Sequence, residues 1–130
     1  MNHSESVDQN AVLRARTLLL GSGTINIHEA VDAYRLLAEV SPAVYLPRLA
    51  QALLEFGTAD PRNPETRLTV VTEAAAAARR MEPAEPRRAA LLRKALEACE
   101  QELTVLGRTE QARSVSEELA RAVRGEEGSR

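Results

Sequence analysis

Residues 28–57, HEAVDAYRLLAEVSPAVYLPRLAQALLEFG, constrain the fold more than any other stretch of the chain. Apolar side chains recur at helical spacing on both sides of Ser41-Pro42, and a proline disfavours helical backbone at the residue before it. The two apolar stripes consist of Ala30, Tyr34, Leu37 and Ala38, and of Leu46, Leu49, Leu53 and Phe56. Two amphipathic helices are therefore expected, and each needs neighbouring helices to shield its stripe from water.

Capping residues and prolines set the expected ends of these helices. The first starts near Asn26, whose side chain can cap it. The second helix is expected to start between Pro42 and Pro47, with Pro47 in its first turn, because a proline there needs no amide donor. Gly57 is expected to end it. An earlier helix is predicted over residues 8–20, where Gly21 stops it.

Three more helices complete the expected set. One has Asn63 as N-cap and Pro64 as its first residue, the next covers residues 86–106 with Gly107 after it, and the last opens at Thr109. The buried positions expected outside the central stretch are Val12, Ala15, Leu19, Leu68, Val71, Ala75, Ala78, Met81, Leu92, Leu96, Cys99, Leu103, Leu106, Ala112, Val115, Leu119 and Val123. No segment alternates with period two, so the chain is predicted to be all-α with about six helices.

Length and composition indicate how such helices are organised. At 130 residues the chain has the length of one domain, expected at residues 8–124 between a disordered leader (1–7) and a disordered tail (125–130). Hydrophobic residues make up 44% of the chain and aromatic residues only 2%, so the core is expected to consist of Leu, Val and Ala. Such cores suit closely packed helices.

Charge and cysteine content argue against several partners and locations. Net charge is -2 with acidic and basic residues interspersed, so neither nucleic acid nor a membrane is expected as a partner. No stretch has the pattern of a secretory signal or the ~20 apolar residues of a transmembrane helix. The single cysteine, Cys99, excludes an internal disulfide. A cytoplasmic protein is therefore expected.

A repeat with a period of 41 residues relates the helices to one another. Ala30, Val71 and Ala112 follow at this interval on three different predicted helices, and Pro42 and Pro83 are separated by the same interval. A constant spacing of small, large and proline positions is typical of stacked helical hairpins, because each hairpin presents the same packing surface to the next. Three hairpins are therefore expected.

At these residues the chain resembles the tetratricopeptide repeat family. EAVDAYRLLAEVSP is similar to the second helix of that motif, and Leu53 with Phe56-Gly57, like Leu96 with Cys99, is similar to the first. SPAVYLPRLAQALLEFG and residues 106–112 also resemble the long-period arrays common in actinobacterial proteins. The resemblance covers residues 26–124 and implies an α-solenoid, a right-handed stack of three antiparallel hairpins.

Some positions depart from the family pattern. The period of 41 residues exceeds the usual 34, which implies longer first helices or longer turns. Ser116 stands where a large residue is expected, and the helix over residues 8–20 matches the motif poorly. The first hairpin is therefore either a true repeat or a cap.

Few residues have the pattern of a catalytic, metal or cofactor site. His3 and His28 have no cluster of Cys, His or carboxylates at ligand spacing around them. Cys99 lies on an apolar stripe, which favours a buried, inert thiol over a nucleophile. Gly21-Ser22-Gly23 follows an apolar helix and lacks the Lys-Ser/Thr ending of a phosphate loop. We expect no catalysis, no metal and no cofactor.

The resemblance implies a function in protein interaction. In the family, first helices line a concave groove that binds peptides, and the matching polar positions here are Arg48, Gln51, Arg87, Lys94, Glu97 and Gln101. This set has a basic excess, which suits a protein or peptide with acidic groups. Two alternatives stay open. One is a homodimer through the N-terminal helix, which has more leucines than one face can bury, and the other is an enzyme or small-molecule sensor.

Overall fold

The computed structural model describes residues 9–20, 27–59 and 63–128, and these residues form six α-helices and no strand. The helices are α1 (Gln9–Leu20), α2 (Ile27–Val40), α3 (Pro42–Ala59), α4 (Pro64–Arg80), α5 (Arg88–Val105) and α6 (Thr109–Gly128). The prediction of an all-α chain with about six helices is confirmed over this part of the chain. The expected leader, the cap at Asn26 and the stop at Gly21 lie outside the described residues.

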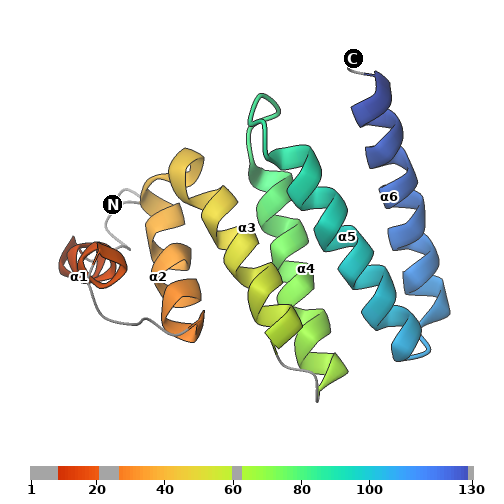
Figure 1. Cartoon of the computed structure of the whole chain (residues 1–130), viewed down its shortest axis with the longest axis horizontal. Coiled ribbons are helices and arrows are strands. Elements are labelled where there is room, and N and C mark those ends of the chain that lie inside the picture. Colours follow the sequence, from red (N-terminus) through yellow and green to blue (C-terminus); the bar gives the residue numbers. More distant parts are fainter. Residues whose placement is uncertain (1–8, 21–26, 60–62, 129–130) are drawn as a thin grey trace, which may run out of the picture.

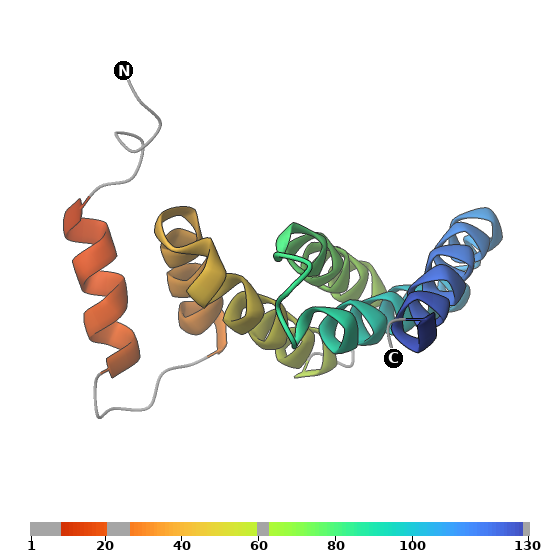
Figure 2. The ribbon, with the colours of Figure 1, turned by 90° about the horizontal axis from the view of Figure 1, so that it is seen from above.

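The helices follow one another across the molecule in chain order (Figure 1). Each packs against the next, and α3 also contacts α5. From α2 to α6 the helices run alternately in opposite directions, but α1 is seen end-on in Figure 1 and lengthwise in Figure 2. The helix α1 therefore crosses α2 and is not antiparallel to it. None of the described helices combines the length and the apolar character that crossing a membrane requires.

Small side chains form much of the core. The main apolar cluster joins α2, α3, α4 and α5, and a smaller cluster of Val12, Ala15, Ala33 and Leu37 joins α1 to α2. In the alanine run of α4, only Ala76 faces solvent, and the other four alanines are buried. Alanine on the buried face allows α4 to approach both of its neighbours closely, as expected for a core that is poor in aromatic residues.

The start of α3 lies within the expected range, but the expected place of Pro47 and the expected end of the helix are wrong. The helix begins at Pro42, and Pro47 lies in the second turn and not in the first, with its side chain fully buried. Both prolines suit a first turn, and the sequence does not distinguish them, whereas burial of the Pro47 ring offsets the loss of its amide donor. The helix also continues past Gly57 to Ala59, because Gly57 is buried against α4 and does not act as a cap.

The other predicted caps are confirmed where the structure describes them. Asn63 caps α4, since its Oδ1 accepts a hydrogen bond of 3.2 Å from the Thr66 amide, and Pro64 is the first helical residue. After α5, Gly107 has a φ of +74°, and its amide and that of Arg108 donate to the last carbonyls of the helix over 3.0 and 2.9 Å. This left-handed glycine turn directs the chain into α6.

The expected buried face of α6 is only half-buried. Val115 and Leu119 contact the core, but no residue between positions 109 and 125 is fully buried. The reason is that α6 is the last helix of the row, so that it has a neighbour on one side only. The helix nevertheless extends to Gly128, beyond the end at residue 124 that the sequence indicated.

Matching ion pairs join alternate helices. Arg35 of α2 binds Glu73 of α4 through two hydrogen bonds of 2.8 and 2.7 Å, and Arg79 of α4 binds Glu118 of α6 through two bonds of the same lengths. Both are bidentate pairs, which fix geometry better than single contacts. The even-numbered helices are thereby linked to one another, while α3 and α5 contact each other.

Candidate functional site

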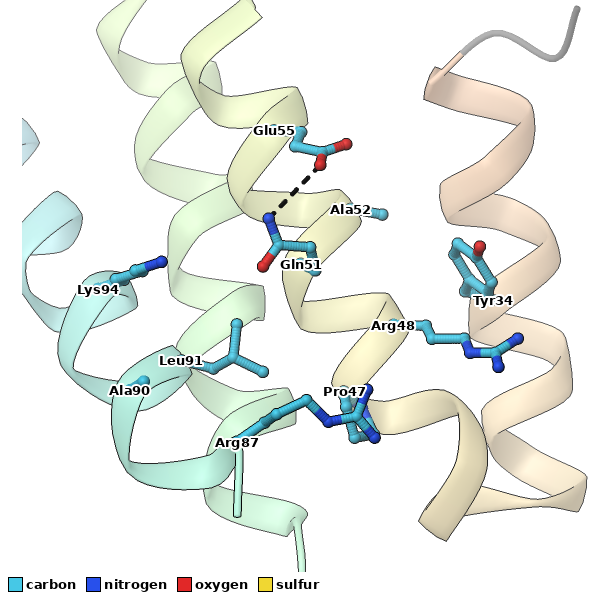
Figure 3. Close-up of a pocket in the computed structure, with 10 residues that line it drawn as sticks. All are labelled: Tyr34, Pro47, Arg48, Gln51, Ala52, Glu55, Arg87, Ala90, Leu91 and Lys94. Atoms are coloured by element: carbon cyan, nitrogen blue, oxygen red, sulfur yellow. Dashed lines mark hydrogen bonds between the residues drawn. The ribbon is translucent and has the colours of Figure 1, made fainter. Parts of the chain in front are cut away.

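A groove of about 360 Å³ lies between α3 and α5, with α2 at one edge (Figure 3). Its lining consists of Tyr34 from α2, Pro47, Arg48, Gln51, Ala52 and Glu55 from α3, and Arg87, Ala90, Leu91 and Lys94 from α5 and the residue before it. Four predicted site residues are therefore brought together: Arg48, Gln51, Arg87 and Lys94. The other two, Glu97 and Gln101, are exposed farther along α5 and do not line the groove.

Helical periodicity explains how these side chains reach one surface. Arg48, Gln51 and Glu55 are spaced by three and four residues, so they share the face of α3 opposite its buried leucines. Arg87 and Lys94 are seven residues apart, close to two turns, at the start of α5. Since α3 and α5 contact each other, the two polar faces form the sides of a single depression.

The charge of the groove is positive. Arg48, Arg87 and Lys94 line it, and Glu55 is the one carboxylate among its lining residues. In the described part of the chain, no carboxylate lies within ion-pair distance of Arg48 or Lys94. The groove therefore has cationic groups that a bound carboxylate can reach.

Three local contacts hold the polar side chains of the groove. Arg87 donates two hydrogen bonds, of 3.2 and 2.8 Å, to Oε1 of Glu85. The guanidinium of Arg48 lies 5.6 Å from the centre of the Tyr45 ring, within range of a cation–π contact. The amide of Gln51 donates to Glu55 over 3.4 Å (Figure 3). Arg48 and Arg87 are thus partly positioned before any ligand binds.

The floor of the groove is apolar. Leu91 and Ala52 are buried at its base, with Ala90 and the ring of Tyr34 beside them. Among the described residues, no group of three His, Cys, Asp or Glu side chains is placed to hold a metal ion. An apolar floor with cationic sides is suited to binding an extended segment.

Cys99 lies away from this groove, on the other side of α5. It is 4% exposed and lines a cleft of about 380 Å³ between α4, α5 and α6. Desolvation by burial raises the pKa of its thiol, and the contact with the Thr72 hydroxyl at 4.0 Å opposes this effect. A raised thiol pKa reduces the thiolate fraction near neutral pH and so the nucleophilicity of the side chain.

The sequence pattern missed several lining residues. Glu55 follows Arg48 at i+7 and Leu91 follows Arg87 at i+4, so helical spacing could have identified both. Tyr34 was assigned to the core, and it lies half-buried at the groove edge. A second pocket forms where the start of α3 meets the connection between α4 and α5, a contact between segments that are distant in sequence.

Comparison of the chain with protein-family models, with curated proteins and with solved structures gave no match.

Proposed function

We propose that the chain is a non-catalytic interaction module that binds an extended acidic segment of a partner protein in the groove between α3 and α5. The observation that carries this proposal is the gathering of Arg48, Arg87 and Lys94 from two helices around an apolar floor. Guanidinium and ammonium groups bind carboxylates through charge-assisted hydrogen bonds. Arg87 is already paired with Glu85, so the charge complementarity that favours an acidic ligand comes from Arg48 and Lys94, against one lining carboxylate, Glu55.

The proposal includes the finer architecture. We infer a right-handed stack of tetratricopeptide-like hairpins, in which α3 pairs with α4 and α5 with α6, while α1 crosses α2 at the N-terminal end. Support comes from the packing of helices in chain order, the contact of α3 with α5, and the two bidentate ion pairs that join α2 to α4 and α4 to α6. The crosswise course of α1 favours a cap over a true repeat for the first pair. A cytoplasmic location belongs to the same proposal.

Charge reversal in the groove tests this function. A fluorescent peptide with several consecutive glutamates should bind the wild-type chain in an anisotropy titration, and Lys94→Glu should weaken it about tenfold or more through repulsion. Binding should also weaken as salt is raised. Arg124→Glu is the matched control, since it makes the same charge change on an exposed position of α6. Equal affinities of the two variants would exclude the groove as the binding site.

Self-association through α1 is a second candidate function. Leu13 and Leu18 are 59% and 40% exposed on this helix, and a second copy could cover them. Size-exclusion chromatography with light scattering distinguishes the two candidate functions, because it measures the molecular mass in solution. A monomeric mass at every concentration would leave the groove as the candidate interface.

A further inference from the structure

A second pocket, of about 400 Å³, adjoins the groove at the start of α3. It is lined by Pro42, Ala43, Leu46 and Pro47 of α3, and by Arg80, Met81, Glu82, Ala84 and Glu85 at and beyond the end of α4. Leu46 and Met81 are buried, so they form an apolar base. Arg80 and Glu82 are exposed and opposite in charge, so this pocket lacks the cationic excess of the groove.

The groove and the second pocket are direct neighbours. Pro47 lines both. On the other side, Arg87 of the groove is hydrogen-bonded to Glu85 of the second pocket. Pro47 and the pair of Arg87 with Glu85 therefore lie on the boundary that the two depressions share, and an extended chain lying along this part of α3 would contact both.

The order of the lining residues along α3 gives the distance between the second pocket and the groove. Positions 42–47 line the second pocket and positions 47–55 line the groove. With a helical rise of 1.5 Å per residue, the centres of these two stretches are about 10 Å apart along α3. An extended peptide covers this distance in about three residues.

We propose that the segment bound in the groove carries a bulky apolar side chain about three residues from its acidic stretch, and that this side chain occupies the second pocket. The inference rests on the proposed function and deepens it by naming the ligand as a two-part segment. The carboxylates bind Arg48 and Lys94, beside the pair of Arg87 with Glu85, and the apolar side chain binds against Leu46 and Met81. Apolar burial then adds affinity that is insensitive to salt.

Three labelled peptides test the inference by fluorescence anisotropy. The first has three glutamates and a phenylalanine three residues away, the second has alanine in place of the phenylalanine, and the third has the phenylalanine eight residues away. The wild-type chain should bind the first about tenfold more tightly than the second, because one large apolar side chain is buried. The third should bind no better than the second.

Variants that place a large side chain in the second pocket test whether the pocket binds the phenylalanine of the peptide. Ala43→Phe changes an exposed residue in the first turn of α3, and Ala84→Phe changes an exposed residue of the connection after α4. Each should remove the preference for phenylalanine and leave the affinity for the alanine peptide unchanged. Lys94→Glu should weaken all three peptides together. Circular dichroism of each variant checks that the helices are intact.

The outcomes separate this inference from the proposed function. Equal binding of the first two peptides, both weakened by Lys94→Glu, would overturn the inference and leave the proposed function intact. Failure of all three peptides to bind, or no effect of Lys94→Glu, would overturn both. A wild-type dimer that Lys94→Glu converts to a monomer would place a second copy in the groove and would also overturn the inference.

Discussion

Gly57 shows how one residue sets the distance between two helices. It lies inside α3, and a Cβ built at this position would be 2.8 Å from Cγ1 of Val71 in α4. Real Cβ atoms do not approach so closely, and the β-branched side chain of Val71 has little freedom to move away. The glycine therefore permits a close contact between α3 and α4, although it disfavours helix by about 1 kcal/mol relative to alanine.

Gly57→Ala should lower the free energy of unfolding by about 1 to 3 kcal/mol, because overpacking outweighs the gain in helix propensity. Urea denaturation followed by circular dichroism measures the change. Gly125→Ala is the control, since nothing lies within 4 Å of a Cβ there, and it should be neutral or slightly stabilising. In a Val71→Ala background, Gly57→Ala should be less destabilising. A stabilised Gly57→Ala variant would contradict the proposed clash.

At the scale of the element, α6 is held by polar contacts as well as by apolar ones. Its apolar side chains are half-buried, and the bidentate pair of Arg79 with Glu118 joins it to α4. The hydrogen bonds from Arg79 hold the pKa of the Glu118 carboxyl below its usual range, with desolvation acting in the opposite direction. The same pair raises the pKa of the Arg79 guanidinium.

Glu118→Gln should lower the free energy of unfolding at pH 7 by up to about 1 kcal/mol, the upper range for an exposed ion pair. Because the folded-state pKa of Glu118 is depressed, its contribution is present above the unfolded pKa of about 4.3. The contribution is lost as pH falls through the lower folded value. The difference between wild type and variant should therefore disappear in strong acid, when urea midpoints are compared across pH.

Glu117→Gln is the matched control for this experiment. Glu117 is the preceding residue of α6 and is exposed. Its replacement should leave the urea midpoint nearly unchanged at every pH. An equal loss of stability in both variants would show that the negative charge on α6 in general, and not the pair of Glu118 with Arg79, stabilises this helix.

At the scale of the whole molecule, burial is concentrated in the middle of the chain. Leu53 of α3, Ala74 and Ala78 of α4 and Leu96 of α5 are all fully buried, whereas the two terminal helices each have a neighbour on one side only. Local unfolding requires less free energy where fewer apolar contacts are lost. The terminal helices α1 and α6 should therefore open independently of the centre.

Hydrogen exchange measured by mass spectrometry should show that the terminal helices open more easily than the central ones. The slowest amides are expected in α4 and in the central turns of α3 and α5, and exchange should be at least tenfold faster in α1 and α6, which corresponds to about 1.4 kcal/mol less protection. Exchange in α6 as slow as in α4 would mean that the molecule opens only as a whole.

Helix type and several helix ends followed from local sequence. Apolar periodicity identifies the six helices, and residue type alone identifies Asn63-Pro64 and Gly107 as caps. Capping depends on residues within a few positions of each other, which is why the sequence alone indicates it. The same periodicity brought Arg48 and Gln51, and Arg87 and Lys94, to exposed helical faces.

Only the tertiary structure decided which exposed faces meet and which residues adjust the distances between helices. The groove forms where α3 contacts α5, two helices that α4 separates in the sequence, and Glu97 and Gln101 lie farther along α5 than this contact reaches. Gly57 and Pro47 look like helix boundaries in the sequence, and both are buried within α3. Periodicity defines the orientation of a side chain about its own helix axis, whereas the position of the neighbouring helix depends on packing between residues that are distant in sequence.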